Sequence, residues 1–348
     1  MIPHSSPTLG REELSAVSEV LLSGCIAQGK KVKEFEEQFS QFLGLKMAKA
    51  VNSGTSALHL ALIALGVKAG DEVIAPDLVC TALLNAVNYV GANAIIADIN
   101  GDDYNLSYDD AKRRITKKTR AVIIPHIFGT PARDTERFKD MGIPVIEDCA
   151  QSVGGKIRGR NVGTLGDISI FSFYATKVFT TGEGGMIASD SDGLIERVVD
   201  LREYDNKEDY RIRYNYKMTD IQGAIGIEQL KKLPDFISKR RRIAEYYNRA
   251  LNDLPIKLPL TSPEIEGISY RYVICSDRAQ ELIGFLRSNG IGAAKPVFRL
   301  LHELARPQQG SYPVADNVWR DSVSLPIYPK LSDAEAEQVI RFTRLFFD

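Results

Sequence analysis

Short apolar runs alternate with helical stretches from residue 47 to about residue 200, and this alternation limits the possible folds most strongly. The runs are rich in Val and Ile, which is typical of strands buried on both faces of a sheet. Strands that alternate with helices form βαβ units, so we predict an α/β fold with a mostly parallel sheet flanked by helices. The predicted strands are Met47–Val51, Glu72–Ala75, Ala94–Asp98, Ala121–Ile124, Pro144–Glu147, Ile168–Phe173 and Gly185–Ala188, and the predicted helices between them cover residues 56–66, 78–90, 107–115, 134–141 and 190–201.

The two ends of the chain show a different pattern. Residues 11–23 and 31–43 are predicted to be amphipathic helices, with Leu14, Val17, Val20 and Leu21 on one face of the first and Val32, Phe35, Phe39 and Phe42 on one face of the second. After residue 232 we predict a charged helix at 236–251, a strand at 270–275 and helices at 278–288 and 332–346. A length of 348 residues fits about two domains. We therefore expect a large domain over residues 1–235 and a smaller α+β domain over 236–348.

Charge and cysteine usage exclude several classes of function. Lys and Arg number 44 against 45 for Asp and Glu, so the chain lacks the basic excess of a nucleic-acid-binding protein. The run Lys239–Arg242 is basic, and we interpret it as a solvated helix face. The four cysteines and four histidines are scattered, so we predict free thiols, a reducing compartment and no metal site. Without a signal-peptide pattern or an apolar run that could span a membrane, the expected location is the cytoplasm.

Open α/β sheets bind ligands beyond the carboxyl ends of their strands, so we expect the site residues at the junctions after the strands. After the strand Met47–Val51, a glycine turn (Gly54) leads into a helix that begins with Thr55 and Ser56. Free N–H groups and hydroxyls at a helix N-terminus can bind a phosphate. The same hydroxyl residues also serve as ordinary helix caps, and both interpretations remain open at this point.

Two further junctions carry ionisable side chains. Glu147, Asp148 and Gln151 follow a buried strand, where a carboxylate is costly unless a cation meets it or it caps the next helix. Lys177 follows the aromatic strand Ile168–Phe173 and precedes the glycine-rich segment Gly182–Gly185. An amine in such apolar surroundings can have its pKa lowered, which suits Schiff-base chemistry.

Taken together and in this order, these segments resemble the DegT/DnrJ/EryC1/StrS family of sugar aminotransferases, which use pyridoxal phosphate (PLP) and have fold type I. The most specific signature is Ser-Phe-x-x-x-Lys-x-x-Thr-Thr-Gly-Glu-Gly-Gly, which begins at Ser172. The resemblance covers nearly the whole chain, through Gly24–Phe35, Asn52–Leu58, Gly70–Ile74, His126–Gly129, Glu147–Gln151, Gly166–Gly185, Asn215–Gln222 and Ser324–Leu331.

The resemblance implies a role for each matched residue. Lys177 matches the lysine that forms a Schiff base with the cofactor and later moves protons. Asp148 matches the carboxylate that keeps the pyridine nitrogen protonated, and Gln151 the amide near the phenolic oxygen. The phosphate cradle is matched by Gly54, Thr55, Ser56 and Ser172. Asn215 matches a residue that reaches the phosphate of the neighbouring subunit's cofactor, which implies a homodimer with composite active sites.

The implied reaction is a ping-pong transamination. An amino-acid donor, glutamate in most of the family, passes its amino group to the cofactor, which then aminates a keto group of a nucleotide-linked sugar. Related sugar dehydratases have histidine at the position of Lys177, so the sequence favours the aminotransferases. The Thr-Thr-Gly-Glu-Gly-Gly form favours members that aminate C4 of a keto-deoxy sugar.

Some features of the sequence leave the resemblance incomplete. Cys80 stands where many relatives have an aromatic residue that stacks on the cofactor ring, and we count it among the cofactor-binding residues. A cyclitol or another keto sugar is an alternative substrate. A non-catalytic PLP- or sugar-binding regulator is a second alternative, because fold alone does not determine function. The arginine that binds the donor carboxylate is not identified; Arg202, Arg271 and Arg299 are the candidates.

Overall fold

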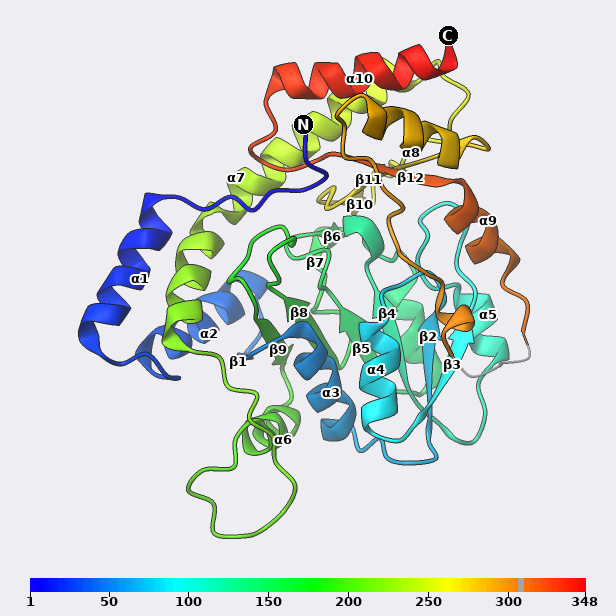
Figure 1. The fold of residues 1–348 in the computed structure, drawn as a ribbon. Coiled ribbons are helices and arrows are strands. Elements are labelled where there is room, and N and C mark those ends of the chain that lie inside the picture. The colour runs from blue at the N-terminus through cyan, green and yellow to red at the C-terminus, as the bar shows by residue number, and fades with distance from the viewer. Residues whose placement is uncertain (306–309) are drawn as a thin grey trace.

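A computed structural model describes residues 1–305 and 310–348 of the chain (Figure 1). Within this part of the chain, the main sheet has seven strands in the order β1-β9-β8-β5-β4-β2-β3. The pairs from β8 through β5, β4 and β2 to β3 are parallel, whereas β9 is antiparallel to both of its neighbours. This confirms the predicted α/β fold with a mostly parallel sheet. The strands are β1 (Met47–Val51), β2 (Glu72–Pro76), β3 (Asn93–Ala97), β4 (Thr119–Pro125), β5 (Val145–Asp148), β8 (Ile168–Ser172) and β9 (Gly185–Ser189).

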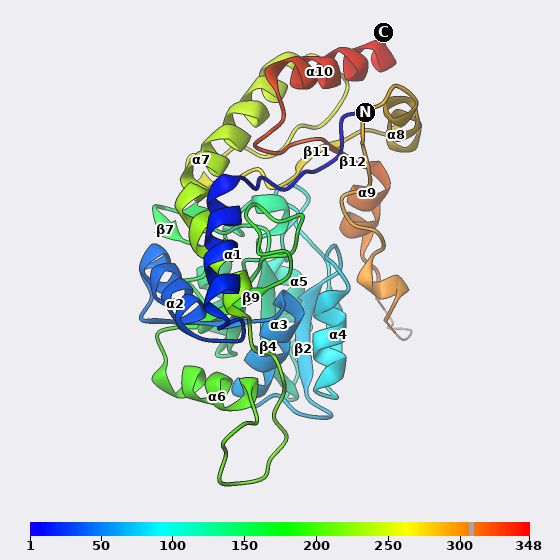
Figure 2. The same ribbon diagram turned by 60° about the vertical axis from the view of Figure 1, so that its left-hand side comes forward.

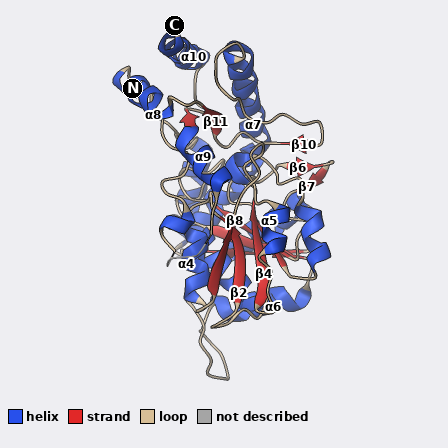
Figure 3. Ribbon diagram, turned by 90° about the vertical axis from the view of Figure 1, so that its right-hand side faces the viewer, coloured by secondary structure: helices blue, strands red, loops and turns tan. Residues whose placement is uncertain are grey.

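Helices cover both faces of this sheet (Figure 3). The strands are almost fully buried, which explains why their sequences are continuous apolar runs without alternation. One face packs against α3 (Gly54–Ala64), α4 (Ala82–Tyr89) and α6 (Asp192–Arg202). The helices of the other face are α2 (Lys30–Leu43), α5 (Tyr108–Arg113) and the first half of α7 (Asp220–Leu251).

The first helix, α1 (Arg11–Ser23), packs on α7 in a way that its apolar pattern did not predict. Of the predicted apolar face, Val20 is buried, whereas Leu14 and Leu21 are 68% and 56% exposed. The buried residues are Val20 and Glu13. The Glu13 carboxylate accepts hydrogen bonds from Gln229 Nε2 and Lys232 Nζ of α7. These polar contacts orient α1 on α7.

Helix α7 is one continuous element from Asp220 to Leu251, and the charged helix predicted at 236–251 is its second half. Thr219 caps its N-terminus in a capping box with Gln222. Asp220 accepts hydrogen bonds from the N–H groups of Gly29, Lys31 and Val32, and so caps α2 from another part of the chain. The predicted boundary at residue 235 lies inside α7, and the division into two domains remains a prediction.

The C-terminal part contains a two-stranded sheet of β11 (Tyr272–Cys275) and β12 (Ser322–Leu325), which lies beyond one end of the main sheet (Figures 1 and 2). Helices α8 (Ala279–Ser288) and α10 (Asp333–Phe347) agree with the predicted ones, whereas α9 (Pro313–Asp321) and β12 were not predicted. Ile2, near the N-terminus, belongs to the hydrophobic cluster that joins β11, β12, α8 and α10. A small sheet of β10 (Ile265–Glu266), β6 (Lys156–Ile157) and β7 (Arg160–Asn161) lies between the two parts.

The interpretation of Lys239–Arg242 as a solvated helix face is wrong for Arg240. This side chain is 2% exposed, and its guanidinium donates hydrogen bonds to the carbonyl oxygens of Tyr270 and Ile327. Burial lowers the pKa of Arg240 to about 10. Arg240 is buried because α7 packs against the segments that contain Tyr270 and Ile327. The buried carbonyl groups of these segments need hydrogen-bond donors, and Arg240 provides them.

Two expectations from composition agree with the structure. All four cysteines are free thiols, with Cys149 buried and Cys25 and Cys80 exposed. Among the described residues, no helix combines the length and the apolar character needed to cross a bilayer.

Candidate active site

The register of the main sheet brings the predicted site residues to one edge. Gly185 of β9 lies opposite both Val51 of β1 and Ser172 of β8, so the ends of β1 and β8 are close. Asp148, at the end of β5, pairs with Ile170 of β8. The carboxyl ends of β1, β5 and β8 therefore meet at the same edge, as in other open α/β sheets that bind ligands.

The turn between β1 and α3 forms a narrow cradle against β8. A Cβ atom added to Gly54 would lie 2.8 Å from Cβ of Ser172, so only glycine fits here without displacing Ser172. Thr55 and Ser172 are half-buried, and no described residue bonds to their hydroxyls. The Ser56 hydroxyl instead donates to Asn52 Oδ1 at 2.7 Å and holds the turn, while Ser53 caps the helix. Free N–H groups, two free hydroxyls and the helix dipole are what a phosphate group needs.

Asp148 has an unsatisfied carboxylate at the end of β5. It is 6% exposed, and Oδ1 accepts the N–H of Ala150 at 3.0 Å. In the described part of the chain, Oδ2 has no hydrogen-bond donor. Burial raises the pKa of Asp148, and the Ala150 N–H and the positive charge of Lys177 only partly oppose this effect. Such a carboxylate fits a cationic ring N–H that would donate to it.

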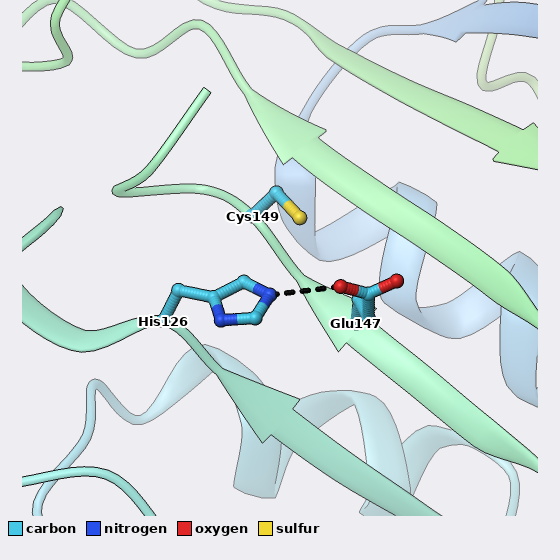
Figure 4. A group of neighbouring side chains, drawn as sticks. All are labelled: His126, Glu147 and Cys149. Carbon is cyan, nitrogen blue, oxygen red and sulfur yellow. Dashed lines mark hydrogen bonds and ion pairs between the residues drawn. The ribbon is translucent and has the colours of Figure 1, made fainter. Parts of the chain in front are cut away.

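The preceding residue, Glu147, anchors this strand end through a buried network (Figure 4). Its carboxylate accepts hydrogen bonds from His126 Nε2 at 3.0 Å and from the N–H groups of Gly163, Leu165 and Gly166. His126 Nδ1 accepts the Ala132 N–H, so Nε2 carries the proton. Burial acts to raise the pKa of Glu147, but these hydrogen bonds outweigh it and the net pKa is lowered.

Cys149 lies next to this pair, and together they form a possible group of metal donors. Both nitrogens of His126 and both oxygens of Glu147 are already committed to hydrogen bonds. Burial raises the pKa of the Cys149 thiol, which disfavours the thiolate that a metal would need. The network is therefore better suited to hold Asp148 in place than to bind an ion.

Lys177 lies in the loop after β8 and has a free amine. Within the described residues, its Nζ has neither a hydrogen-bond acceptor nor an ion-pair partner. It lies 5.4 Å from the ring centroid of Tyr270, whose hydroxyl is 3.4 Å from Thr176 Oγ1. An amine held over an aromatic ring without a carboxylate partner is available for covalent chemistry.

Cys80 lies close enough to Lys177 and Asp148 for both charges to act on its thiol. The residue is exposed, and desolvation by the surrounding protein raises the pKa of the thiol. Gln151 follows β5, and its Oε1 accepts the N–H of Phe128 at 2.8 Å, which fixes the orientation of its amide. The expected roles of both residues remain predictions.

Asn215 is exposed and follows the long loop after α6, which extends away from the body of the chain (Figures 1 and 2). Its carbonyl oxygen accepts a hydrogen bond from Asn52 Nδ2 at 3.3 Å. No described residue contacts its side-chain amide through a hydrogen bond, so the side chain is free to reach outward.

Sequence reasoning missed Tyr270 and His4, which lie close to Lys177 and Arg271 respectively. No local pattern marks these residues, since Tyr270 ends an irregular segment before β11 and His4 precedes the first helix. His126 lay within a block that carried the resemblance, but the sequence assigned it no role.

Comparisons with known proteins agree with this geometry. The sequence profile of the DegT/DnrJ/EryC1/StrS aminotransferase family matches residues 7–344. GDP-perosamine synthase of Vibrio cholerae is 35% identical over 370 residues, which cover 100% of both chains. The crystal structure of the aminotransferase TlmJ from Streptoalloteichus hindustanus superposes with a TM-score of 0.94 at 30% identity, over 99% of this chain and 98% of that one. The putative sugar aminotransferase Spr1654 of Streptococcus pneumoniae, in its PLP form, has a TM-score of 0.92 at 27% identity, over 99% of this chain and 98% of that one.

The chain belongs to the DegT/DnrJ/EryC1/StrS aminotransferase family. It is a PLP-dependent sugar aminotransferase of fold type I, as the resemblance implied. The residues at the edge of the sheet fit this cofactor: the cradle at Gly54 suits its phosphate, Asp148 its ring nitrogen and Lys177 its aldehyde.

We predict that Gly54→Ala weakens the binding of PLP. The added methyl group would push Ser172 out of the cradle, and overpacking of this kind costs about 1–3 kcal/mol, or about 5- to 150-fold in affinity. Titration of the apo protein with PLP, followed by absorbance, measures the dissociation constant. Gly193→Ala is the control, because its new Cβ would meet nothing within 4 Å. Equal affinities for both variants would contradict the phosphate cradle.

Proposed function

We propose that this enzyme aminates a keto group at C4 of a nucleotide-linked keto-deoxy sugar, with glutamate as the amino donor, by ping-pong transamination. The observation that carries the proposal is the unpartnered Lys177 amine beside the buried, incompletely satisfied Asp148. The full-length match to a protein named GDP-perosamine synthase supports a nucleotide-linked sugar as substrate. The family resemblance supports glutamate.

The chain's own residues would act as follows. PLP, when bound, supplies an electron sink that stabilises negative charge on the substrate carbon. Asp148 would keep the ring nitrogen protonated, and its buried position strengthens that hydrogen bond. In each half-reaction Lys177 Nζ would move one proton between the substrate carbon that carries the nitrogen and C4′ of the cofactor, first as base and then as acid. Gln151 would lie near the phenolic oxygen of the cofactor, and Cys80 would take the place of the residue that stacks on the ring.

Two other functions are compatible with the family. A cyclitol or a free keto sugar would need the same residues around the cofactor and would differ only in the substrate contacts. A non-catalytic regulator would require loss of the lysine chemistry, and Lys177 is present with a free amine. We therefore favour the enzyme, and place it in the cytoplasm because its four cysteines are unpaired.

Replacing Lys177 should separate the enzyme from the regulator. Borohydride reduction of the wild-type holoenzyme should attach the cofactor to the peptide that contains Lys177, as detected by mass spectrometry. Lys177→Ala should abolish this attachment and lower turnover by at least about 100-fold, the lower range for an acid–base group. Lys46→Ala, which removes an exposed lysine paired with Asp192, should leave both unchanged. Attachment at another lysine, or full activity of Lys177→Ala, would refute the assignment.

The substrate can be tested in the second half-reaction. The enzyme, loaded with amino groups by glutamate, is mixed with a nucleotide-linked 4-keto-6-deoxy sugar, its 3-keto isomer, the free 4-keto sugar or a keto-cyclitol. We expect rapid recovery of the PLP spectrum with the first compound alone, and at least about 100-fold slower recovery with the others, since the nucleotide provides binding energy that positions the keto group. Faster reaction with the cyclitol or the 3-keto isomer would replace the present proposal.

We further propose that the active enzyme is a homodimer with composite sites. Asn215 has an exposed side chain, and the apolar residues Leu14, Leu21 and Leu22 of α1 are exposed as well. An exposed apolar group of this kind is typical of a surface covered by a partner. In this arrangement, Asn215 would contact the cofactor phosphate of the second subunit.

Mixing two inactive variants tests the composite site. Lys177→Ala and Asn215→Ala should each be strongly impaired, because each site would need both residues. If the residues come from different subunits, a hybrid dimer has one intact site, so an equimolar mixture should recover about a quarter of the wild-type activity after subunit exchange. A mixture no more active than its components would show that both residues act in the same subunit. Sedimentation analysis measures the oligomeric state independently.

A further inference from the structure

We propose that His59 positions Asn215 for the cofactor phosphate of the second subunit, by holding the side chain of Tyr216. This proposal rests on the composite site proposed above. His59 would be a positioning residue, which acts on the site of the other subunit although it belongs to the helix that carries the cradle of its own subunit.

His59 is a polar residue in the apolar helix α3, five residues after Gly54. It is 4% exposed. A buried polar group is costly unless it makes a hydrogen bond. The Nδ1 atom of His59 lies 3.1 Å from the hydroxyl oxygen of Tyr216, whereas Nε2 has no partner among the described residues. The hydrogen bond that compensates for the burial of this imidazole is therefore the one with Tyr216.

The surroundings of His59 are aromatic and keep its imidazole neutral. Its ring contacts three tyrosine rings edge-on, with centroid distances of 4.8 Å to Tyr214, 5.4 Å to Tyr89 and 5.9 Å to Tyr216. Burial lowers the pKa of His59. A charged imidazole would carry a proton on each nitrogen, and the proton on Nε2 would have no acceptor here. The imidazole is thus fixed by packing and by a single hydrogen bond.

The segment that contains Asn215 directs this side chain away from His59. The rings of Tyr214 and Tyr216 stack at 5.0 Å with an angle of 14° between their planes, so these two side chains lie on the same side of the segment. In extended backbone the residue between two such neighbours faces the opposite side, and Asn215 is indeed exposed. The imidazole therefore holds one side of the segment while Asn215 extends from the other.

The backbone of this segment is also held, but by other groups. The N–H of Asn52 donates to the carbonyl oxygen of Tyr216 at 2.9 Å, and Asn52 Nδ2 donates to that of Asn215 at 3.3 Å. The N–H groups of Tyr214 and Tyr216 donate to the carbonyls of Leu201 and Arg202 at the end of α6. None of these contacts involves the Tyr216 hydroxyl, which bonds only to the imidazole in the described part of the chain. Loss of the imidazole would release this side chain and the orientation of the adjacent Asn215.

A second route has to be separated from this one. Helix α3 begins with the phosphate cradle, so a change at His59 can also disturb the cradle of its own subunit. The two routes differ in the subunit whose cofactor site is weakened. Hybrid dimers distinguish them, because each subunit can carry a different substitution.

The homodimers are measured first, by a readout that does not depend on turnover. The apo protein is incubated with increasing PLP and reduced with borohydride, and mass spectrometry gives the PLP concentration at which half of Lys177 is modified. We expect His59→Leu and Tyr216→Phe each to raise this concentration at least about 5-fold, since each leaves a buried partner without its hydrogen bond. The double variant should be no weaker than the single variants, because both remove the same contact.

Two further variants show whether the effect is specific. His59→Asn can place an amide near the position of Nδ1, and should bring the half-saturating PLP concentration back to within about 2-fold of the wild-type value. Tyr89→Leu removes an exposed ring that contacts the same imidazole but keeps the bond to Tyr216, and should bind PLP as the wild type does. A failure of His59→Asn to restore binding would show that the hydrogen bond is not what matters.

The hybrid contains one Lys177→Ala subunit and one His59→Leu subunit, and is isolated through two different affinity tags. PLP can be attached only to Lys177 of the His59→Leu subunit. In the proposed arrangement that site receives Asn215 from the subunit with an intact His59. We therefore expect the half-saturating PLP concentration of the hybrid to return to the wild-type value.

A hybrid that binds PLP as weakly as the His59→Leu homodimer would overturn the proposal, and so would a His59→Leu homodimer that binds PLP normally. If His59→Leu does not fold, Tyr216→Phe takes its place in the hybrid. The same hybrid made with Asn215→Ala tests the composite site itself. Without recovery in that hybrid the composite site has failed, whereas recovery there but not with His59→Leu refutes the role of His59 alone.

Discussion

The alignment of strand ends at one edge of the main sheet is the constraint on which the candidate site depends. Because β1, β5 and β8 run in the same direction, the glycine turn, Asp148 and the loop of Lys177 are brought together from three separate stretches of sequence. The antiparallel strand β9 makes this possible, since Gly185 lies between Val51 and Ser172 and lets the Ser53 backbone approach closely. Any side chain at residue 185 would prevent that approach.

The two carboxylates at this edge differ in how fully they are hydrogen-bonded, and only Asp148 has an oxygen left for a cofactor. Asp148 is buried with one unsatisfied oxygen, whereas the adjacent Glu147 is fully satisfied by His126 and three backbone N–H groups. Two neighbouring carboxylates therefore have opposite pKa shifts, and the difference comes from their hydrogen-bond partners. Glu147 stabilises the strand end, and Asp148 remains available for a ligand.

The sequence predicted the regular elements of the large sheet well because their apolar runs are continuous and buried on both faces. It predicted α1 in the right place and its buried Val20, but not the burial of Glu13, which contacts Gln229 and Lys232 more than 200 residues away. The sequence did not predict β12 and α9 either, because their contacts also join segments that are distant in the chain. The N-terminus of α9 is capped by Asp98, whose carboxylate accepts the N–H groups of Val314 and Ala315.

What the sequence determined by itself was the class of fold and the family, because strand–helix alternation and the signature around Lys177 are local patterns. The tertiary structure alone decided which distant residues meet. Arg240 became buried rather than solvated, Tyr270 came to lie against Lys177, and Arg271 came to contact His4. These contacts join segments far apart in the chain, and their free energy depends on burial and on unpaired charge, which no local pattern encodes.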